Sequence, residues 1–455
     1  MPVILGANSA SGGYSVANSL RFNSGSSDNL SKTFGTATSR RIFTISTWIK
    51  RSNLDTVQNV FTAGTGSGDA GIRFNSGNEL FFYEISSPYS AYNFEFSTSQ
   101  LFRDVSAWYH IVVAVDTTQA TNTNRVKIYV NGSQITAFGV ASYPSQNYDS
   151  HLNNSVTHRI SGAVDTTFGT RYYNGYVSET FFIDGQQLTP SSFGETDEDT
   201  GIWIPKAYTG SFGTNGFYLE FKDSSALGDD TSGNGNDFTV NNLTSIDQTT
   251  DTPTNNWCTI NSVAVNTANI PTMTDGNLTA LSTTGSNASL TGTLAVGSGK
   301  WYYEAKSISG TPGDRVLKLG WGNPDKSPQN QIQASIIYRS SDGNKYIDNS
   351  GSAYGATYTD GDIIGVALDI SGGTVTFYKN GTTQGNITIS GGLDDGTFYI
   401  PFGEVGNTDK VSFNFGNPPF TISSGNADAN GYGNFEYAVP AGYFALCTKN
   451  LAEYA

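Results

Sequence analysis

The segment DTSGNGND, which begins at Asp230, has the residue types and spacing of a calcium-binding loop. Asp230, Ser232 and Asn234 stand where such a loop supplies oxygen ligands, and Asp237 offers a further carboxylate. The twelfth position is Asn241, whereas calcium loops place a bidentate Glu there. A loop of Asx turns that hydrogen-bonds its own backbone has the same composition. A calcium ion and a purely structural loop are therefore both open interpretations.

A second acidic run, FGETDEDTG, contains Glu195, Asp197, Glu198 and Asp199. Retaining glycosidases use two carboxylates about 5–5.5 Å apart, and adjacent inward positions of one strand can provide that separation. The run lacks the spacing Glu-x-Asp-x-x-Glu and the apolar alternation of such a strand, and it follows a Pro-Ser-Ser-Phe turn. We interpret it as a solvated acidic loop.

The three histidines, His110, His151 and His158, show neither the HExxH spacing of zinc proteases nor a triad-like arrangement. No Gly-x-Ser-x-Gly elbow leads into a helical pattern, and no phosphate-binding loop is present. His110 stands between Trp108 and Ile111 in a strand-like run, which indicates a structural residue. No catalytic residue is predicted, and the protein is expected not to be an enzyme.

Tyrosines in turn-rich segments are the candidates for ligand contact, because sugar rings and protein partners both favour aromatic surfaces. The candidates are Tyr89, Tyr92, Tyr143 and Tyr148 in the first half of the chain and Tyr338 and Tyr346 in the second. Each of them can instead cover the core at the base of a loop. Both interpretations are open for every one of the six.

The composition favours strands and bounds the possible partners. The 455 residues suggest two or three domains, and 52 Gly, 25 Tyr and 27 Phe without helical periodicity indicate an all-β chain. A net charge of −15 with no basic run argues against nucleic acid, and no apolar stretch reaches the length for membrane insertion. The two cysteines, Cys258 and Cys447, fit no metal pattern, so free buried thiols or a neighbouring pair are both open.

Four phrases occur in order between Asn18 and Phe238: WIK, WYHIVVAVD, VKIYVNGSQI and GYVSETFFIDG. Their order resembles the LamG, concanavalin A-like sandwich family. The resemblance implies an antiparallel sandwich of the jelly-roll type that binds glycans or proteins, often through loops at one rim and sometimes with calcium.

The phrases WYYEA, LGWGN, YGATYTDGDIIGVALDISGGTVTFYKNG and FNFG, between Gly299 and Pro419, closely resemble the SPRY domain family. The resemblance implies a second antiparallel sandwich that recognises a partner. The pairs Gly372-Gly373 and Asn380-Gly381 predict tight hairpin turns within it. The polar run from Ser327 to Ser350 lies where recognition loops of the family diverge, so the resemblance does not identify the partner.

The predicted organisation is all-β, with two antiparallel sandwiches and a short N-terminal arm. The arm spans residues 1–17 and the concanavalin A-like sandwich spans residues 18–242. A polar linker with outer strands covers residues 243–298, and the SPRY-like sandwich with a C-terminal strand covers residues 299–455.

This pairing of modules with an arm resembles structural proteins of marine phages. The prediction is a non-enzymatic virion protein, a tail fibre or a capsid-decorating fibre, that attaches to a host-surface glycan or protein. Expected partners are other virion proteins, through the arm, and further copies of the chain, with a homotrimer favoured because avidity strengthens weak sites. The N-terminus lacks the basic region of a signal peptide, which suggests assembly in a host cytoplasm and exposure on the particle. A cellular glycan-binding or adhesion protein is the alternative, and a glycan hydrolase is less favoured.

Overall fold

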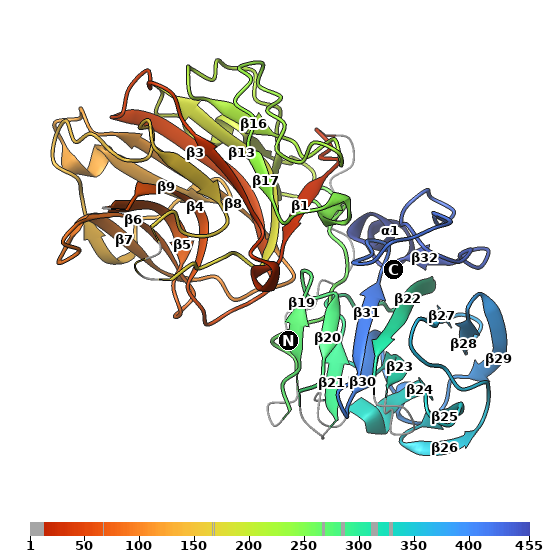
Figure 1. Cartoon of the computed structure of the whole chain (residues 1–455). Helices are drawn as coiled ribbons and strands as arrows, with labels where there is room; N and C mark the ends of the chain where they lie inside the picture. The colour runs from red at the N-terminus through yellow and green to blue at the C-terminus, as the bar shows by residue number, and fades with distance from the viewer. Residues whose placement is uncertain are drawn as a thin grey trace. The chain divides into compact units, whose positions relative to one another are not determined.

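The computed structural model describes residues 13–66, 68–165, 167, 169–265, 269–283, 287–310, 317–326 and 331–455. These residues form two compact units, one that runs through Thr254 and one from Asn255 to Ala455 (Figure 1). Both units consist of facing β-sheets, so the prediction of an all-β chain with two sandwiches is confirmed. None of the helices described has the length and apolarity needed to cross a membrane. Most of the predicted N-terminal arm lies outside the described residues.

The N-terminal unit contains two eight-stranded sheets with antiparallel pairing (Figure 1). In order across the first sheet, the strands are β10 (Ser133–Gln134), β9 (Val126–Val130), β8 (Trp108–Asp116), β3 (Ile42–Arg51), β13 (Gly175–Asp184), β1 (Ser19–Phe22) and β18 (Gln248–Thr249), with β16 (Phe217–Leu219) beside β13. A separate two-stranded ladder joins β14 (Gly194–Thr196) to β15 (Trp203–Pro205).

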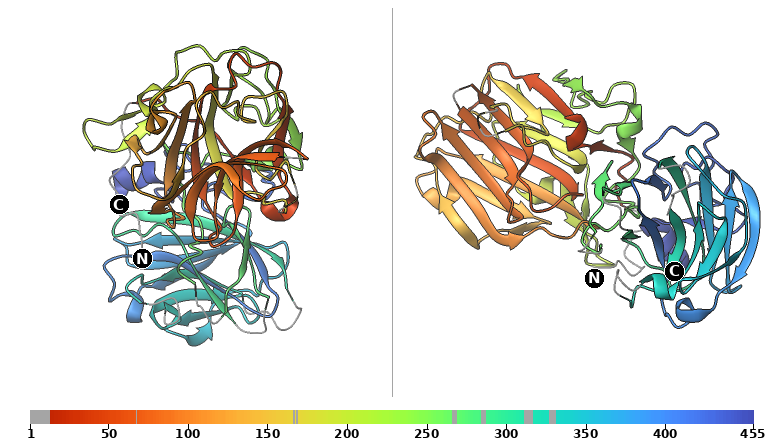
Figure 2. Two further views of the ribbon diagram at one scale, coloured as in Figure 1. Left: turned by 90° about the vertical axis from the view of Figure 1, so that its left-hand side faces the viewer. Right: turned by 60° about the horizontal axis from the view of Figure 1, so that its bottom comes forward.

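The second sheet of this unit carries the long strands that are visible side by side in Figure 2. In order, they are β11 (Phe138–Ser142), β7 (Tyr92–Leu101), β6 (Glu79–Ser86), β5 (Gly68–Phe74), β4 (Gln58–Thr65), β12 (Thr157–Ile160), β2 (Asn29–Thr33) and β17 (Thr239–Asn241). Alternate side chains of these strands, such as Ile72, Phe82 and Phe96, enter the core between the two sheets. The other set faces away from that core, as the period of two along a strand requires.

The sequence of strand β8 contains a continuous apolar run because both faces of the strand are covered. Ile111, Val113 and Val115 pack into the core between the sheets. Val112 and Ala114 pack on the opposite face against a smaller cluster that includes Phe181, Ile183 and Phe193. Both faces of β8 are therefore buried, which removes the usual polar alternation.

The C-terminal unit pairs an eight-stranded sheet with a six-stranded sheet. The larger sheet has the order β19 (Thr272–Thr274), β20 (Thr279–Leu281), β31 (Lys410–Asn414), β22 (Lys300–Ser309), β27 (Ile363–Asp369), β28 (Thr374–Lys379) and β29 (Thr382–Thr388), with β32 (Phe444–Ala445) parallel to β22. The smaller has the order β21 (Ala288–Thr291), β30 (Ile400–Val405), β23 (Lys318–Gly322), β24 (Ser335–Arg339), β25 (Asn344–Ile347) and β26 (Ser350–Ala353).

The hairpin of β27 and β28 lies in the core of the C-terminal unit. Its apolar residues Ile364, Val366, Leu368, Val375 and Phe377 are fully buried. The Asn380-Gly381 turn after β28 has φ of 47° and 76°, the left-handed values of the predicted tight turn. The Gly372-Gly373 turn is wider than predicted: Asp369 pairs with Thr374, and of the two glycines Gly373 has positive φ.

The first and last segments of the C-terminal unit meet at its two cysteines. Trp257 forms an isolated antiparallel bridge with Cys447, and α1 (Thr448–Tyr454) follows. Cys258 and Cys447 are both buried. Burial raises the pKa of the Cys447 thiol to about 12, so this thiol stays protonated and unreactive at neutral pH.

Candidate binding site

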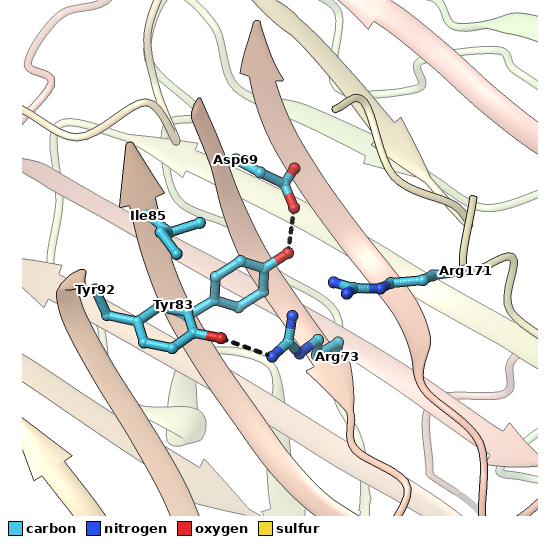
Figure 3. Close-up of a pocket in the computed structure, with 6 residues that line it drawn as sticks. All are labelled: Asp69, Arg73, Tyr83, Ile85, Tyr92 and Arg171. Carbon is cyan, nitrogen blue, oxygen red and sulfur yellow. Dashed lines mark hydrogen bonds between the residues drawn. The ribbon is translucent and has the colours of Figure 1, made fainter. Parts of the chain in front are cut away.

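A small hollow opens on the second sheet of the N-terminal unit, on the face turned away from the core (Figure 3). Strand β5 contributes Asp69 and Arg73, which alternate with the core residues Ala70, Ile72 and Phe74. The remaining lining residues come from β6, from β7 and from the loop between β12 and β13; they are Tyr83, Ile85, Tyr92 and Arg171.

The hollow has a cavity volume of about 40 Å³. Pockets that hold a whole small-molecule ligand usually have about 300–1,000 Å³. The space therefore suits a single small polar group of a larger ligand, and a whole ring would have to lie outside it.

The guanidinium of Arg73 is held in one orientation. It lies 4.3 Å from the ring centre of Tyr83 and 4.5 Å from that of Phe81, which are cation–π distances. Its Nη2 donates to the hydroxyl of Tyr92 at 3.2 Å, and its Nε donates to Oδ1 of Asn75 at 2.9 Å. These contacts fix a positive charge at the floor of the hollow.

Asp69 is the carboxylate among the six lining residues, and its side chain is incompletely paired. The residue is only 2% exposed, and its Oδ2 accepts a hydrogen bond from the hydroxyl of Tyr83. Its Oδ1 is buried and has no hydrogen-bond partner. Burial raises the pKa of Asp69 to about 6, so the carboxylate is mostly ionised at neutral pH.

Arg171 extends its guanidinium towards Tyr83 and Arg73 from the opposite side (Figure 3). Its backbone has φ of 51°, a left-handed conformation that is uncommon for a non-glycine residue. Burial and the neighbouring charge of Arg73 lower the pKa of Arg171. The guanidinium groups of Arg171 and Arg73 thus approach the same space as the carboxylate of Asp69, which interacts electrostatically with both.

Two family models match the chain and cover separate parts of it. The model described as the concanavalin A-like lectin/glucanases superfamily matches residues 23–191, and the SPRY domain model matches residues 300–418. The chain carries a concanavalin A-like domain followed by a SPRY domain. The hollow lies entirely within the concanavalin A-like domain.

Among solved structures, the chain is similar to the crystal structure of the SPRY domain of human HERC1. The sequence identity is 17% and the TM-score is 0.29. The similarity covers 34% of this chain and 96% of that chain.

Two of the six predicted tyrosines lie at the hollow. Tyr92 lines it, and Tyr89 packs beside it against the cluster of Phe81, Tyr83 and Ile85. Sequence reasoning missed the charged residues. The sequence GDAGIRF does place Asp69 and Arg73 on one face of a strand opposite apolar residues, but it gives no sign of Arg171 beside them.

Tyr143 and Tyr148 pack against the core of the concanavalin A-like domain and take no part in the hollow. The ring of Tyr143 meets Phe96 edge-on, with 4.9 Å between ring centres. The hydroxyl of Tyr148 donates to Oε1 of the buried Glu84 at 2.7 Å. The same carboxylate accepts a bond from Nδ1 of His151 at 2.6 Å.

In the SPRY domain, Tyr338 is fully buried, so its prediction as a ligand contact is corrected. It lies on the inner face of β24, in phase with Ile336, and its hydroxyl donates to the carbonyl of Ala356. Tyr346 is half-buried on β25. Its hydroxyl donates to Oδ2 of Asp342 at 2.9 Å and accepts from Nη1 of Arg339 at 3.0 Å.

The carboxylate of Asp230 is occupied by the chain itself. Its Oδ1 accepts from the backbone N–H groups of Tyr218 and Ser232, each at 2.9 Å. Its Oδ2 accepts from the hydroxyl of Ser232 at 2.9 Å and the N–H of Asn236 at 2.8 Å. The amide of Asn234 donates to the carbonyls of Gly213 and Gly216 at 2.8 Å.

Asp237 completes this loop, because its Oδ1 accepts from the backbone N–H of Asp230 at 2.9 Å. Within the described part of the chain, no group of three or more His, Cys, Asp or Glu side chains is arranged to hold a metal. The bonds are those of the Asx-turn interpretation, and calcium binding stays a prediction.

The acidic run is largely exposed, with Glu195 paired to Lys206 at 3.1 Å and Asp197 bonded to Thr200.

His110 is buried between Trp48 and Trp203. The indole Nε1 of Trp203 donates to Nδ1 of His110 at 2.9 Å, so the proton on His110 is at Nε2. That Nε2 donates to Oγ of Ser46 at 2.8 Å and cannot accept the hydroxyl proton.

Proposed function

We propose that this protein is a non-enzymatic binding protein whose concanavalin A-like domain holds a glycan on a host surface. The observation that carries the proposal is the hollow lined by Arg73, Arg171, Asp69, Tyr83 and Tyr92. It combines fixed charges and aromatic walls, which are groups that orient a polar substituent of a ligand. A concanavalin A-like domain and a SPRY domain both fit a binding or adhesion role.

The finer proposal is that the chain is a phage virion protein, either a tail fibre or a capsid-decorating fibre. The pairing of the two modules and the acidic, glycine-rich strand composition support it. Docking of residues 1–17 onto other virion proteins and assembly into trimers are parts of the same proposal. Three copies would raise the avidity of a weak site without any new contact.

Binding to an array of polysaccharides and to host cells tests the first proposal. We expect saturable binding by the purified protein, reduced when residues of the hollow are changed. A protein that binds no glycan and no cell surface would contradict the glycan proposal. Mass spectrometry of purified virions tests the second proposal, and absence from the particles would favour the alternative of a cellular adhesion protein.

A glycan hydrolase remains the competing class, and the hollow argues against it. Glycosidases that use the common mechanism need two carboxyl groups beside the scissile bond. The hollow offers Asp69, whose neighbours are Arg73, Arg171, tyrosines and Ile85. We expect no new reducing ends after incubation with mixed polysaccharides, and sustained release would overturn the non-enzymatic assignment.

A further inference from the structure

Residues 13–18, which precede β1, lie against the first sheet of the N-terminal unit without forming a strand. The hydroxyl of Thr254 accepts from the backbone N–H of Val16 and donates to the carbonyl of Val16, each at 3.1 Å. The hydroxyl of Ser178 on β13 donates to the carbonyl of Asn18 at 2.8 Å. Because side chains supply these bonds, the segment can separate from the sheet without breaking a strand ladder.

Tyr14 connects this segment to a buried acid. Its hydroxyl lies 3.1 Å from Oε2 of Glu179 and 2.9 Å from the hydroxyl of Tyr218. The hydroxyl of Tyr218 lies 2.9 Å from both carboxyl oxygens of Glu179. The three groups thus make three mutual contacts, but the two phenols bring only two hydrogens. A proton on the carboxyl of Glu179 supplies the third.

The backbone holds Glu179 in an uncommon conformation. Its φ is 47°, in the left-handed region that residues other than glycine seldom occupy. Between Ser178 and Phe181, β13 has one residue more than the partner strand β3, which makes this a β-bulge. Such strain persists only where the surrounding structure enforces it. The sheet therefore fixes the acid, whereas Tyr14 belongs to a segment outside the sheet.

The charged surroundings of Glu179 favour its neutral form. The three cations of the flanking strands β1 and β3 are paired with other groups: Arg21 with the carbonyl of Ile246, Lys50 with Asp251, and Arg51 with the carbonyl of Phe102. The groups that act on Glu179 are the hydroxyls of Tyr218 and Tyr14 and the carboxylate of Glu220, which follows β16. Glu179 is only 3% exposed. Burial raises its pKa to about 7, and the charge of Glu220 adds to this effect.

We propose that Glu179 is a pH-sensitive latch for residues 13–18: its neutral carboxyl keeps Tyr14 docked, and its ionisation loosens the segment. The direction follows from solvation. With Tyr14 in place, the pKa of Glu179 is about 7, and once Tyr14 leaves, water reaches the carboxyl and the pKa falls towards its ordinary value of 4.5. The undocked form then binds fewer protons, so docking weakens as the pH rises from 4.5 through 7. The latch does not depend on the proposed glycan binding.

One effect acts in the opposite sense. A carboxylate accepts stronger hydrogen bonds from phenols than a neutral carboxyl does, so the bonds from Tyr218 and Tyr14 lower the pKa of Glu179. Burial outweighs them, because the resulting pKa lies well above 4.5. The bond from Tyr218 also remains when Tyr14 leaves, since Tyr218 belongs to β16.

The test is the rate at which dithiodipyridine labels a Val16→Cys variant of the full-length chain. Val16 is only 5% exposed, and both native cysteines are buried in the other unit. Each rate is divided by that of a free peptide with the sequence of residues 13–18 and the same cysteine, which removes the titration of the thiol. We expect this protection to fall at least about tenfold between about pH 5.5 and about pH 8.

Glu179→Gln in the Val16→Cys background decides whether Glu179 causes the fall, and Glu198→Gln is the matched control. Glutamine resembles the neutral carboxyl in size and hydrogen bonding but cannot ionise. Glu198 is exposed in the same unit. We expect Glu179→Gln to keep its protection across this pH range and Glu198→Gln to show the same fall as Val16→Cys alone.

Tyr14→Ala gives a second comparison that does not require Glu179→Gln to fold. Without the ring that covers Glu179, labelling should be fast at every pH. Protection of Val16→Cys that is absent at all pH values, or that does not change with pH, would overturn the inference. The same fall with pH in Glu179→Gln or in Tyr14→Ala would overturn it as well.

Discussion

Lys50 and Asp251 form an ion pair inside the N-terminal unit, with 2.8 Å between Nζ and Oδ2 and side chains only 1% and 0% exposed. The other oxygen of Asp251 accepts a hydrogen bond from Nε1 of Trp108 at 3.0 Å. The pair joins β3 to the segment that follows β18, near the end of the unit's sequence. A charge buried this deeply depends on its partner.

Breaking this pair is therefore expected to destabilise the unit strongly. We expect Asp251→Ala to lower the free energy of unfolding by about 3–5 kcal/mol, because it leaves the ammonium of Lys50 buried without its carboxylate. Urea denaturation followed by tryptophan fluorescence measures the change. The double variant Lys50→Met with Asp251→Leu should recover most of the loss, and a double variant as unstable as the single one would contradict this account.

Because the pKa of Asp69 is raised in the folded protein, we expect the free energy of unfolding to depend on pH. Burial raises the pKa of Asp69 from its ordinary value of 3.8 to about 6, so between pH 4 and 6 the folded protein holds a proton that the unfolded chain releases. The contribution of Asp69 to the free energy of unfolding thus falls as pH rises through this interval, by about 3 kcal/mol in total.

The control for this prediction is the Asp69→Asn variant, which cannot titrate at that position. We expect its stability relative to the wild type to rise from pH 4 to pH 7, as measured by urea denaturation. The comparison isolates Asp69 from His110 and His158, whose pKa values burial lowers to about 3 and which act in the opposite sense. A constant difference between the two proteins would contradict the raised pKa.

In the SPRY domain, Tyr338 lies in the core and Tyr346 lies near the surface, so the two substitutions are expected to differ in their effect on stability. Tyr338→Ala is expected to cost about 3–5 kcal/mol of unfolding free energy, because it empties a fully buried aromatic site. Tyr346→Ala removes a half-buried ring from the outer face of β25 and should cost far less. Thermal unfolding of both variants checks the order, and equal shifts would contradict the placement of Tyr338.

The loop around Asp230 should be stable without a metal. Because the carboxylate of Asp230 accepts four hydrogen bonds from the chain, we expect EDTA to leave the thermal midpoint unchanged. Asp230→Ala should lower that midpoint, since the donors lose their acceptor. A midpoint that rises with added calcium in the wild type and not in Asp230→Ala would instead support the calcium interpretation.

The class of fold was readable from the sequence because burial on one face of a strand leaves a period of two in the residues. The hairpin that ends at Asn380-Gly381 is one example, since its alternation and its turn residues agree. The position of Tyr338 was also encoded, because it alternates in phase with Ile336 along β24. The polar residues around Tyr338 in the sequence make this alternation hard to recognise.

The candidate site was only partly readable. Tyr89 and Tyr92 were identified as aromatic residues in a turn-rich segment, and Asp69 and Arg73 share one face of β5. Arg171 comes from a loop far along the chain, and no local pattern connects it to that strand.

The sequence by itself determined that the chain is all-β, that it carries two sandwich modules, and which faces of many strands are buried. The all-β class and the buried faces follow from local alternation and turn chemistry, and the two sandwich modules follow from the resemblance of ordered phrases to two known families. Tertiary structure alone decided which charges meet, as Lys50 meets Asp251 and as Arg171 meets Arg73. The physical reason is that strand order brings distant residues together and removes them from water, and charge interactions depend on both conditions.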